Sequence, residues 1–179
     1  MPFEFKTFPV KDIVLVTPKV FEDSRGFLLE TYEKNPFNKN SIKFDIVQSN
    51  QSKSSKGVLR GLHFQKGEHA QAKLVKCVAG EIFDVAVDIR PDSNTFGKYV
   101  GVKLTDQNKE MLYIPRGFAH GFEAISEHAE VLYNFDNSYA PDQEGGLIWS
   151  DKTVGINWPI KDPLLSDKDK KWPTLSQLK

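Results

Sequence analysis

Arg60, His63 and Lys73 interrupt apolar runs within the segment GVLRGLHFQKGEHAQAKLVK, which spans residues 57–76. His63 lies between Leu62 and Phe64, with Arg60 before it and Lys73 after it. A cation directed into an apolar core is costly unless it meets an anionic partner or takes part in a reaction. The segment therefore predicts a polar cavity that binds an anion or transfers protons.

The spacing of these residues requires a local irregularity. Arg60 and His63 are an odd number of positions apart, so a regular strand would point them to opposite faces. A bulge at Gly61 would bring both side chains to one cavity. Lys73 alternates with Val75, which directs it to the same side as neighbouring core residues.

A second histidine, His120 in IPRGFAHGF, raises the alternative of a metal site. Small-barrel metal sites commonly use an H-x-H pair among three or four ligands. Here Gln65 follows His63 by two positions, and Phe122 follows His120 by two. We therefore expect no metal.

Proton transfer is the remaining use of a strand histidine, and it works best when a carboxylate orients the imidazole. Asp84 and Asp169 are the candidates, although Asp169 could equally be a helix-capping partner of Ser166. Tyr133 could be an acid that is neutral at pH 7, or an ordinary core tyrosine. Arg25, with Gln48 and Asn50, suits phosphate and base edges but also turn capping.

Short alternating segments bounded by Gly, Pro, Asn and Asp must position these residues. Their spacing of roughly 8–12 residues is typical of an antiparallel sandwich or barrel, so the predicted fold class is all-β. Within residues 82–89, one face combines Ile82 and Ala86 with acidic Asp84, which suits either a barrel interior or a solvent face. A broken helical turn is expected within 32–40 and one short helix within 164–175 before Pro173. The strands are expected within 12–21, 41–50, 57–65, 72–89, 98–105, 110–117 and 129–139.

Composition limits the remaining classes. The 179 residues predict one domain over 1–179, with a tail from about residue 160 packed over it. Twenty-four basic and 24 acidic residues cancel, which disfavours a nucleic-acid binder. The lone Cys77 excludes an intramolecular disulfide, and we expect it to be a buried hydrophobe. No apolar run spans a membrane and the N-terminus lacks a signal-peptide pattern, so a cytoplasmic protein is expected.

Motifs along nearly the whole chain, from about Val20 to Asp169, resemble the dTDP-4-dehydrorhamnose 3,5-epimerase family, whose fold is a metal-free cupin jelly roll. In chain order the motifs are FEDSRGFLLE, VQSNQSKSSKGVLRGLHFQ, KLVKCVAGEIFDVAVDIR, TFGKYVGVKL, YIPRGFAHGF, AEVLYNFDNSYAPDQEGGLIWSD, GINWP and LLSDKD. The resemblance implies a double-stranded jelly-roll barrel with a few short helices.

The resemblance also implies an activity: cofactor-free inversion of C3 and C5 of a nucleoside diphosphate 4-keto-6-deoxy sugar. The usual reaction converts dTDP-4-keto-6-deoxyglucose into dTDP-4-keto-L-rhamnose for surface-polysaccharide synthesis. By similarity, His63 is the base and Asp169 orients it, Lys73 stabilises the enolate oxygen, and Tyr133 is the acid on the opposite face.

Substrate-binding roles follow from the same resemblance. Arg25 and Arg60 would hold the diphosphate, with Lys168 adding charge and Tyr139 flanking the nucleotide. The family is typically a homodimer that exchanges N-terminal strands, so part of each site is expected from the partner chain. The other ligand-contacting positions would be Glu30, Gln48, Ser49, Asn50, His120 and Glu144.

The chain departs from the family at several positions. Ser49 replaces a common Asp, Leu28 a common aromatic residue, and Asn134 and Phe135 replace a common Lys followed by Thr or Ala. These departures leave open an enzyme that inverts one carbon only, or one that acts on a GDP-linked sugar. A sugar-nucleotide-binding jelly roll without activity and a metal-dependent cupin are the alternatives from other classes.

Overall fold

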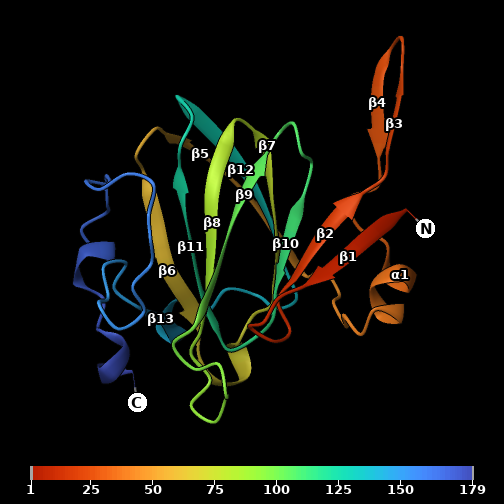
Figure 1. The fold of residues 1–179 in the computed structure, drawn as a ribbon. Helices are drawn as coiled ribbons and strands as arrows, with labels where there is room; N and C mark the ends of the chain where they lie inside the picture. Colours follow the sequence, from red (N-terminus) through yellow and green to blue (C-terminus); the bar gives the residue numbers. More distant parts are fainter. Residues whose placement is uncertain (1, 179) are drawn as a thin grey trace.

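Two antiparallel sheets face each other in the computed structural model, which describes residues 2–178 (Figure 1). The six-stranded sheet contains, in spatial order, β1 (Phe3–Thr7), β2 (Val14–Pro18), β10 (Met111–Ile114), β7 (Lys73–Ala79), β12 (His128–Phe135) and β5 (Gln48–Ser55). The five-stranded sheet contains β13 (Glu144–Gly146), β6 (Leu59–Gln65), β11 (Phe118–Ala124), β8 (Glu81–Asp88) and β9 (Tyr99–Thr105). The order of neighbours is that of a jelly roll, and the predicted all-β cupin barrel is confirmed.

Apolar side chains from both inner faces fill one side of the space between the sheets. Val75 and Cys77 on β7 meet Ile82 and Ala86 on β8, and all four are fully buried. Because side chains alternate along a strand, Asp84 points to the same interior as Ile82 and Ala86. The polar face predicted for residues 82–89 is therefore the barrel interior.

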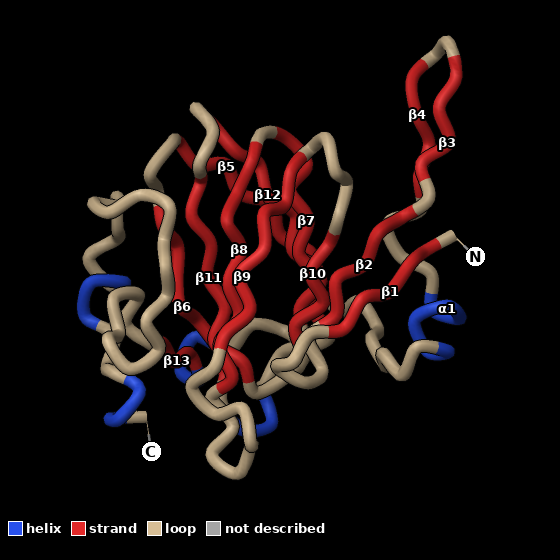
Figure 2. Tube along the Cα trace, viewed as in Figure 1, coloured by secondary structure: helices blue, strands red, loops and turns tan. Residues whose placement is uncertain are grey.

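The C-terminal segment covers the outer face of the five-stranded sheet. Val85 and Val87 pack there against Trp158 and Leu175. Leu164 then continues beside β6, because its backbone N–H donates to Gly57 and its carbonyl accepts from Leu59. Residues 164–169 are thereby brought to the mouth of the barrel, where the tail runs along β6 in Figure 2.

A separate hairpin, β3 (Val20–Asp23) and β4 (Gly26–Leu29), stands away from both sheets (Figure 1). Three large apolar side chains on it are exposed: Phe21 by 51%, Phe27 by 57% and Leu28 by 73%. Phe21 and Leu28 are cross-strand partners on one face of the hairpin, and Phe27 lies on the other face, so both faces expose apolar surface that other protein surfaces normally cover.

The helices of the described residues are each at most six residues long. The turn expected within 32–40 is α1 (Lys34–Lys39), which is held by buried Phe37 beneath β1. The helix expected within 164–175 is reduced to the 3₁₀ turns Asp169–Lys171 and Leu175–Gln177, on either side of Pro173. Among residues 2–178, no helix has the length and apolar character needed to cross a bilayer.

One strand prediction was wrong in its first half. Residues 41–47 are not a strand, and β5 begins only at Gln48. Ile42 and Phe44 instead pack with Phe37 into the apolar cluster outside the six-stranded sheet, where the chain is held by side-chain burial rather than by strand pairing.

Candidate active site

A cavity of about 920 Å³ opens at one end of the barrel, between the two sheets and the C-terminal segment. This volume is in the range of pockets that enclose a ligand of drug or nucleotide size. Its lining includes the following predicted site residues: Gln48, Ser49, Asn50, Arg60, His63, Lys73, His120, Tyr133, Tyr139, Glu144, Lys168 and Asp169.

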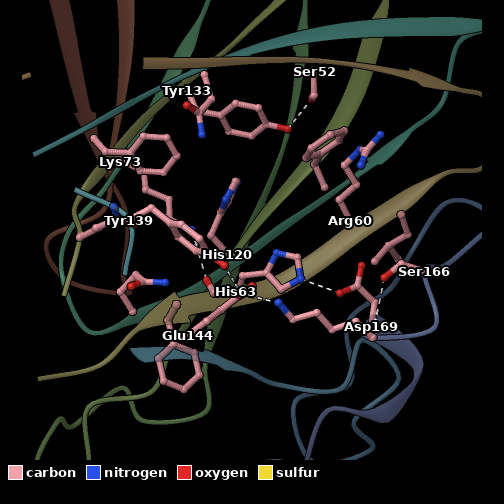
Figure 3. Close-up of a pocket in the computed structure, with 18 of the residues that line it drawn as sticks. Ser52, Arg60, His63, Lys73, His120, Tyr133, Tyr139, Glu144, Ser166 and Asp169 are labelled. Carbon is pink, nitrogen blue, oxygen red and sulfur yellow. Dashed lines mark hydrogen bonds and ion pairs between the residues drawn. The ribbon is translucent and has the colours of Figure 1, made fainter. Parts of the chain in front are cut away.

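His63 and Asp169 form a hydrogen-bonded pair on one wall of the cavity (Figure 3). The Nε2 atom of His63 lies 2.6 Å from Oδ1 of Asp169, although the residues are 106 positions apart. Burial disfavours the charged form of Asp169, but hydrogen bonds from His63, Trp172 and Ser166 outweigh it and lower the pKa. A carboxylate that accepts the Nε2 proton leaves Nδ1 of His63 free as the basic nitrogen.

The structure shows the hydrogen bond expected between Ser166 and Asp169, although the N-cap of the 3₁₀ turn is Lys168 and not Ser166. The backbone N–H of Asp169 donates to the Ser166 hydroxyl at 3.1 Å. Its carboxylate is nevertheless turned away from the turn and toward His63. The hydrogen bond to Ser166 fixes the backbone at the start of the 3₁₀ turn and thereby positions the carboxylate of Asp169.

An irregularity in β6 brings Arg60 and His63 to the same cavity, as predicted. The pairing of β6 with β11 shifts register between His120 and Phe122, opposite Gly61, which adopts a positive φ of 140°. A side chain at Gly61 would also overlap the backbone of Gly121 on the neighbouring strand. Arg60 then reaches Ser54, with its Nε atom 3.0 Å from the hydroxyl oxygen.

Lys73 is buried on β7 and projects into the cavity. Desolvation lowers its pKa to about 8, although the charges of Asp84 and Glu144 act in the opposite direction. Its Nζ atom donates to the backbone carbonyl of His63 at 3.2 Å, which leaves the other ammonium hydrogens for a ligand.

His120 belongs to a second histidine–carboxylate pair. Its Nε2 atom lies 2.8 Å from Oδ1 of Asp84, and both residues are buried. Burial lowers the pKa of His120 because it penalises the charged imidazolium; the charge of Asp84 opposes this effect, and the ammonium of Lys73 adds to it. His120 is therefore a neutral imidazole that donates to Asp84.

The sequence left both aspartates as candidate partners of His63, and the structure assigns them separately. Asp169 meets His63 and Asp84 meets His120, although the two histidines are direct partners across β6 and β11. No group of three or more His, Cys, Asp or Glu side chains with metal-binding geometry occurs within residues 2–178.

Tyr133 lies on the other wall of the cavity, on β12 (Figure 3). Its hydroxyl is 2.7 Å from the hydroxyl of Ser52, which is on the neighbouring strand β5. Burial raises the pKa of Tyr133 further above its ordinary value, so the phenol is protonated at neutral pH. The ring of Phe135 stacks on that of Tyr133 at 6.2 Å.

The mouth of the cavity carries an ordered polar group. The Tyr139 hydroxyl donates to Oε2 of Glu144 at 2.7 Å, and the same oxygen accepts from the ammonium of Lys168. Burial opposes ionisation of Glu144, but these two hydrogen bonds keep its pKa low. Tyr139 is also tied to Gln48, whose Oε1 atom accepts from its backbone N–H at 2.9 Å.

Arg25 and Glu30 are the two predicted site residues that do not line this cavity. Arg25 lies at the tip of the β3–β4 hairpin, where its NH2 atom pairs with Asp23 at 2.5 Å and 88% of its side chain is exposed. Within one chain, the structure therefore does not bring Arg25 or Glu30 to His63.

Several lining residues were not predicted as part of the site. Ser52, Gln71 and Phe122 also line the cavity, as does Phe135. For Ser52 the available signal was its place on the strand that also carries Gln48 and Asn50, since alternation points it to their face.

Comparison with known proteins agrees with this geometry. A sequence model described as dTDP-4-dehydrorhamnose 3,5-epimerase matches residues 7–177. A protein of that name from Shigella flexneri is 54% identical over 161 residues, which covers 89% of each chain. Another from Salmonella typhimurium is 53% identical over 170 residues, covering 94% of this chain and 93% of the relative.

Solved structures extend the similarity to the fold. The crystal structure of dTDP-4-dehydrorhamnose 3,5-epimerase from Elizabethkingia anophelis superposes with a TM-score of 0.94, at 46% identity over 98% of both chains. These matches cover the whole barrel and its C-terminal segment. The chain belongs to the dTDP-4-dehydrorhamnose 3,5-epimerase family.

Proposed function

We propose that this chain inverts C3 and C5 of dTDP-4-keto-6-deoxyglucose to give dTDP-4-keto-L-rhamnose, without a cofactor. One observation carries the proposal: a histidine–aspartate pair and a protonated tyrosine occupy opposite walls of one cavity, with a buried lysine beside them. A dTDP-6-deoxy-D-glucose-3,5-epimerase from Legionella pneumophila, solved in complex with dTDP-4-keto-L-rhamnose, is 39% identical and superposes with a TM-score of 0.95 over 99% of this chain and 95% of that one.

The chemistry needs three groups. The 4-keto group acidifies the hydrogens on the two adjacent carbons, so a base can remove either proton and leave an enolate. His63 is the proposed base, through the nitrogen that does not face Asp169. The C–H electron pair becomes the C=C bond of the enolate, and the carbonyl oxygen takes the negative charge.

Lys73 and Tyr133 are proposed to complete each inversion. The Lys73 ammonium stabilises the enolate oxygen in a desolvated site, where a charge interaction is stronger than in water. Tyr133 then delivers a proton to the opposite face of the same carbon, and the Ser52 hydroxyl is placed to relay a proton from solvent back to the phenolate. His63 loses the abstracted proton to solvent before the second carbon reacts.

The nucleotide is proposed to bind along the cavity mouth. Arg60 and Lys168 supply positive charge for the diphosphate, and half-exposed Tyr139 offers an aromatic face to the base. Gln48, Ser49 and Asn50 follow one another on β5 beside it and offer polar groups to the nucleoside. His120 and Glu144, which line the same cavity, are proposed to contact the ligand.

We further propose that the active form is a homodimer that exchanges N-terminal strands, so that Arg25 and Glu30 reach the pocket of the partner. This arrangement would give the exposed apolar side chains of Phe21, Phe27 and Leu28 a covering surface. Within each chain, residues 1–179 are proposed to act as one domain whose tail from about residue 160 completes the cavity through Ser166 and Asp169.

Incubation with the 4-keto sugar nucleotide in D₂O, followed by NMR, tests the proposed reaction. Deuterium at both C3 and C5 is expected, together with the coupling constants of the inverted sugar. Deuterium at only one carbon would show that the enzyme inverts one carbon only. Deuterium at neither carbon would show that the chain is not an epimerase of this sugar. Parallel reactions with a GDP-linked 4-keto sugar test whether Ser49 changes the choice of nucleotide.

A further inference from the structure

Trp172 contacts the hydrogen-bonded pair of His63 and Asp169 from outside the cavity. Its indole Nε1–H donates to Oδ1 of Asp169 at 3.2 Å. This is the same oxygen atom that lies 2.6 Å from Nε2 of His63. An indole nitrogen is a donor only, so the direction of this hydrogen bond is fixed.

The indole ring also packs against the imidazole itself. The ring centroids of His63 and Trp172 are 6.0 Å apart with an interplanar angle of 70°, an edge-to-face arrangement. Gly146, the cross-strand partner of His63 on β13, provides the space. A Cβ atom on Gly146 would overlap the indole ring.

A third contact joins Trp172 to the charged group at the cavity mouth. The Nζ atom of Lys168 lies 5.4 Å from the centre of the indole ring, and the same ammonium pairs with Glu144. The indole therefore contacts both proposed parts of the site, the His63–Asp169 pair and the Lys168–Glu144 pair. It does so without lining the cavity.

We propose that Trp172 is a positioning residue for the reaction proposed above, which holds the imidazole of His63 and the carboxylate of Asp169 in the orientation that the base requires. This inference rests on the proposed function. The N–H group competes with His63 for one oxygen of Asp169, so it limits how strongly the carboxylate holds the imidazole. The ring edge limits rotation of the imidazole about its side-chain bonds.

Trp172→Phe separates the hydrogen bond from the packing, because it keeps an aromatic ring and removes the N–H donor. The hydrogen bond from Trp172 helps to lower the pKa of Asp169, so its loss raises that pKa. Asp169 then protonates at a higher pH as the solution is acidified. The acid limb of kcat/KM is therefore expected to move to higher pH. At neutral pH we expect kcat to fall roughly 3- to 10-fold, with little change in KM.

Trp158→Phe is the matched control. Its indole N–H also donates within the chain, to the backbone carbonyl of Trp149 at 2.9 Å, but it contacts neither His63 nor Asp169. We expect this variant to lose stability without a shift of the acid limb. Thermal unfolding of both variants shows whether each is folded, and Trp172→Leu repeats the test if Trp172→Phe unfolds.

The outcomes are distinct. An upward shift of the acid limb in Trp172→Phe but not in Trp158→Phe supports the inference. An unchanged profile, a uniform loss of rate at every pH, or the same shift in both variants would overturn it. Failure of the wild-type chain to epimerise the sugar is a separate result, because it overturns the proposed function itself.

Discussion

The ammonium nitrogen of Lys73 lies 3.2 Å from the backbone carbonyl oxygen of His63, and this contact joins the two sheets of the barrel. Lys73 is on β7 of the six-stranded sheet, whereas His63 is on β6 of the five-stranded sheet. The proposed base and the proposed electrostatic group are therefore held at a fixed separation by the packing of the sheets rather than by a flexible loop.

The charge of Lys73 predicts the alkaline limit of activity. Because its pKa is lowered to about 8, the ammonium is present below that pH and is lost as the pH rises through it. We expect kcat to decline above about pH 8, and Lys73→Met to reduce kcat roughly 10²- to 10³-fold at pH 7. Lys76→Met is the control, because Lys76 is buried on the same strand but does not line the cavity. An alkaline limb that stays in place in Lys73→Met would contradict the assignment.

Lys73 should also reduce the stability of the fold. Its pKa falls from 10.5 in the unfolded chain to about 8 in the folded one, so the penalty is fully present below pH 8 and disappears above pH 10.5. Lys73→Met is expected to raise the free energy of unfolding by about 1–3 kcal/mol at pH 7. Urea denaturation at pH 7 and pH 10.5 measures the difference, which should shrink at the higher pH. A variant less stable than the wild type at pH 7 would show that the ammonium stabilises the fold.

Tyr133→Phe removes only the hydroxyl that meets Ser52. The proposed base remains, so hydrogen exchange at carbon is expected to survive better than net inversion, which needs delivery from the far face. NMR in D₂O separates the two quantities in one experiment. Equal loss of exchange and inversion would argue against separate roles for His63 and Tyr133.

Because Arg25 lies outside the cavity of its own chain, hybrid dimers of two inactive variants can test whether it acts in the partner's cavity. Arg25→Ala and His63→Asn chains should each be nearly inactive as pure dimers. In a hybrid dimer, one cavity would combine the intact His63 of one chain with the intact Arg25 of the other. Co-expression followed by tandem affinity purification should recover up to about half of wild-type activity per hybrid, if the arms exchange as proposed. A hybrid as inactive as its parents would show that Arg25 does not act in the partner's site.

Much of the architecture followed from local patterns in the sequence. Alternation grouped Asp84 with Ile82 and Ala86 on one face of β8, which proves to be the inner face, and the odd spacing of Arg60 and His63 predicted the irregularity found opposite Gly61. Both predictions concern neighbours along one strand, where side-chain direction depends on a fixed period of two residues. The strand expected within 41–50 begins only at Gln48, because Ile42 and Phe44 are buried in a cluster around Phe37, a contact that strand periodicity does not encode.

Contacts between side chains that are distant in the sequence were harder to predict. Which aspartate meets which histidine depends on the route of the C-terminal segment along β6. Residue types alone left Asp84 and Asp169 open as partners of His63, and only the family resemblance indicated Asp169. The role assigned to Trp172 had no signal in the sequence, because the contact needs the space above Gly146 on a strand that precedes it by 26 residues. Neither fact can be read from the periodicity of one segment.

The rate of solvent exchange in His63→Asn tests the proposed chemistry most directly. The variant is expected to bind dTDP like the wild type in calorimetry, while deuterium incorporation at C3 and C5 falls roughly 10³-fold or more. His128→Asn, which changes an exposed histidine at the start of β12, should exchange at the wild-type rate. Exchange by folded His63→Asn at a near wild-type rate, at either carbon, would contradict the assignment of His63 as the base for both inversions.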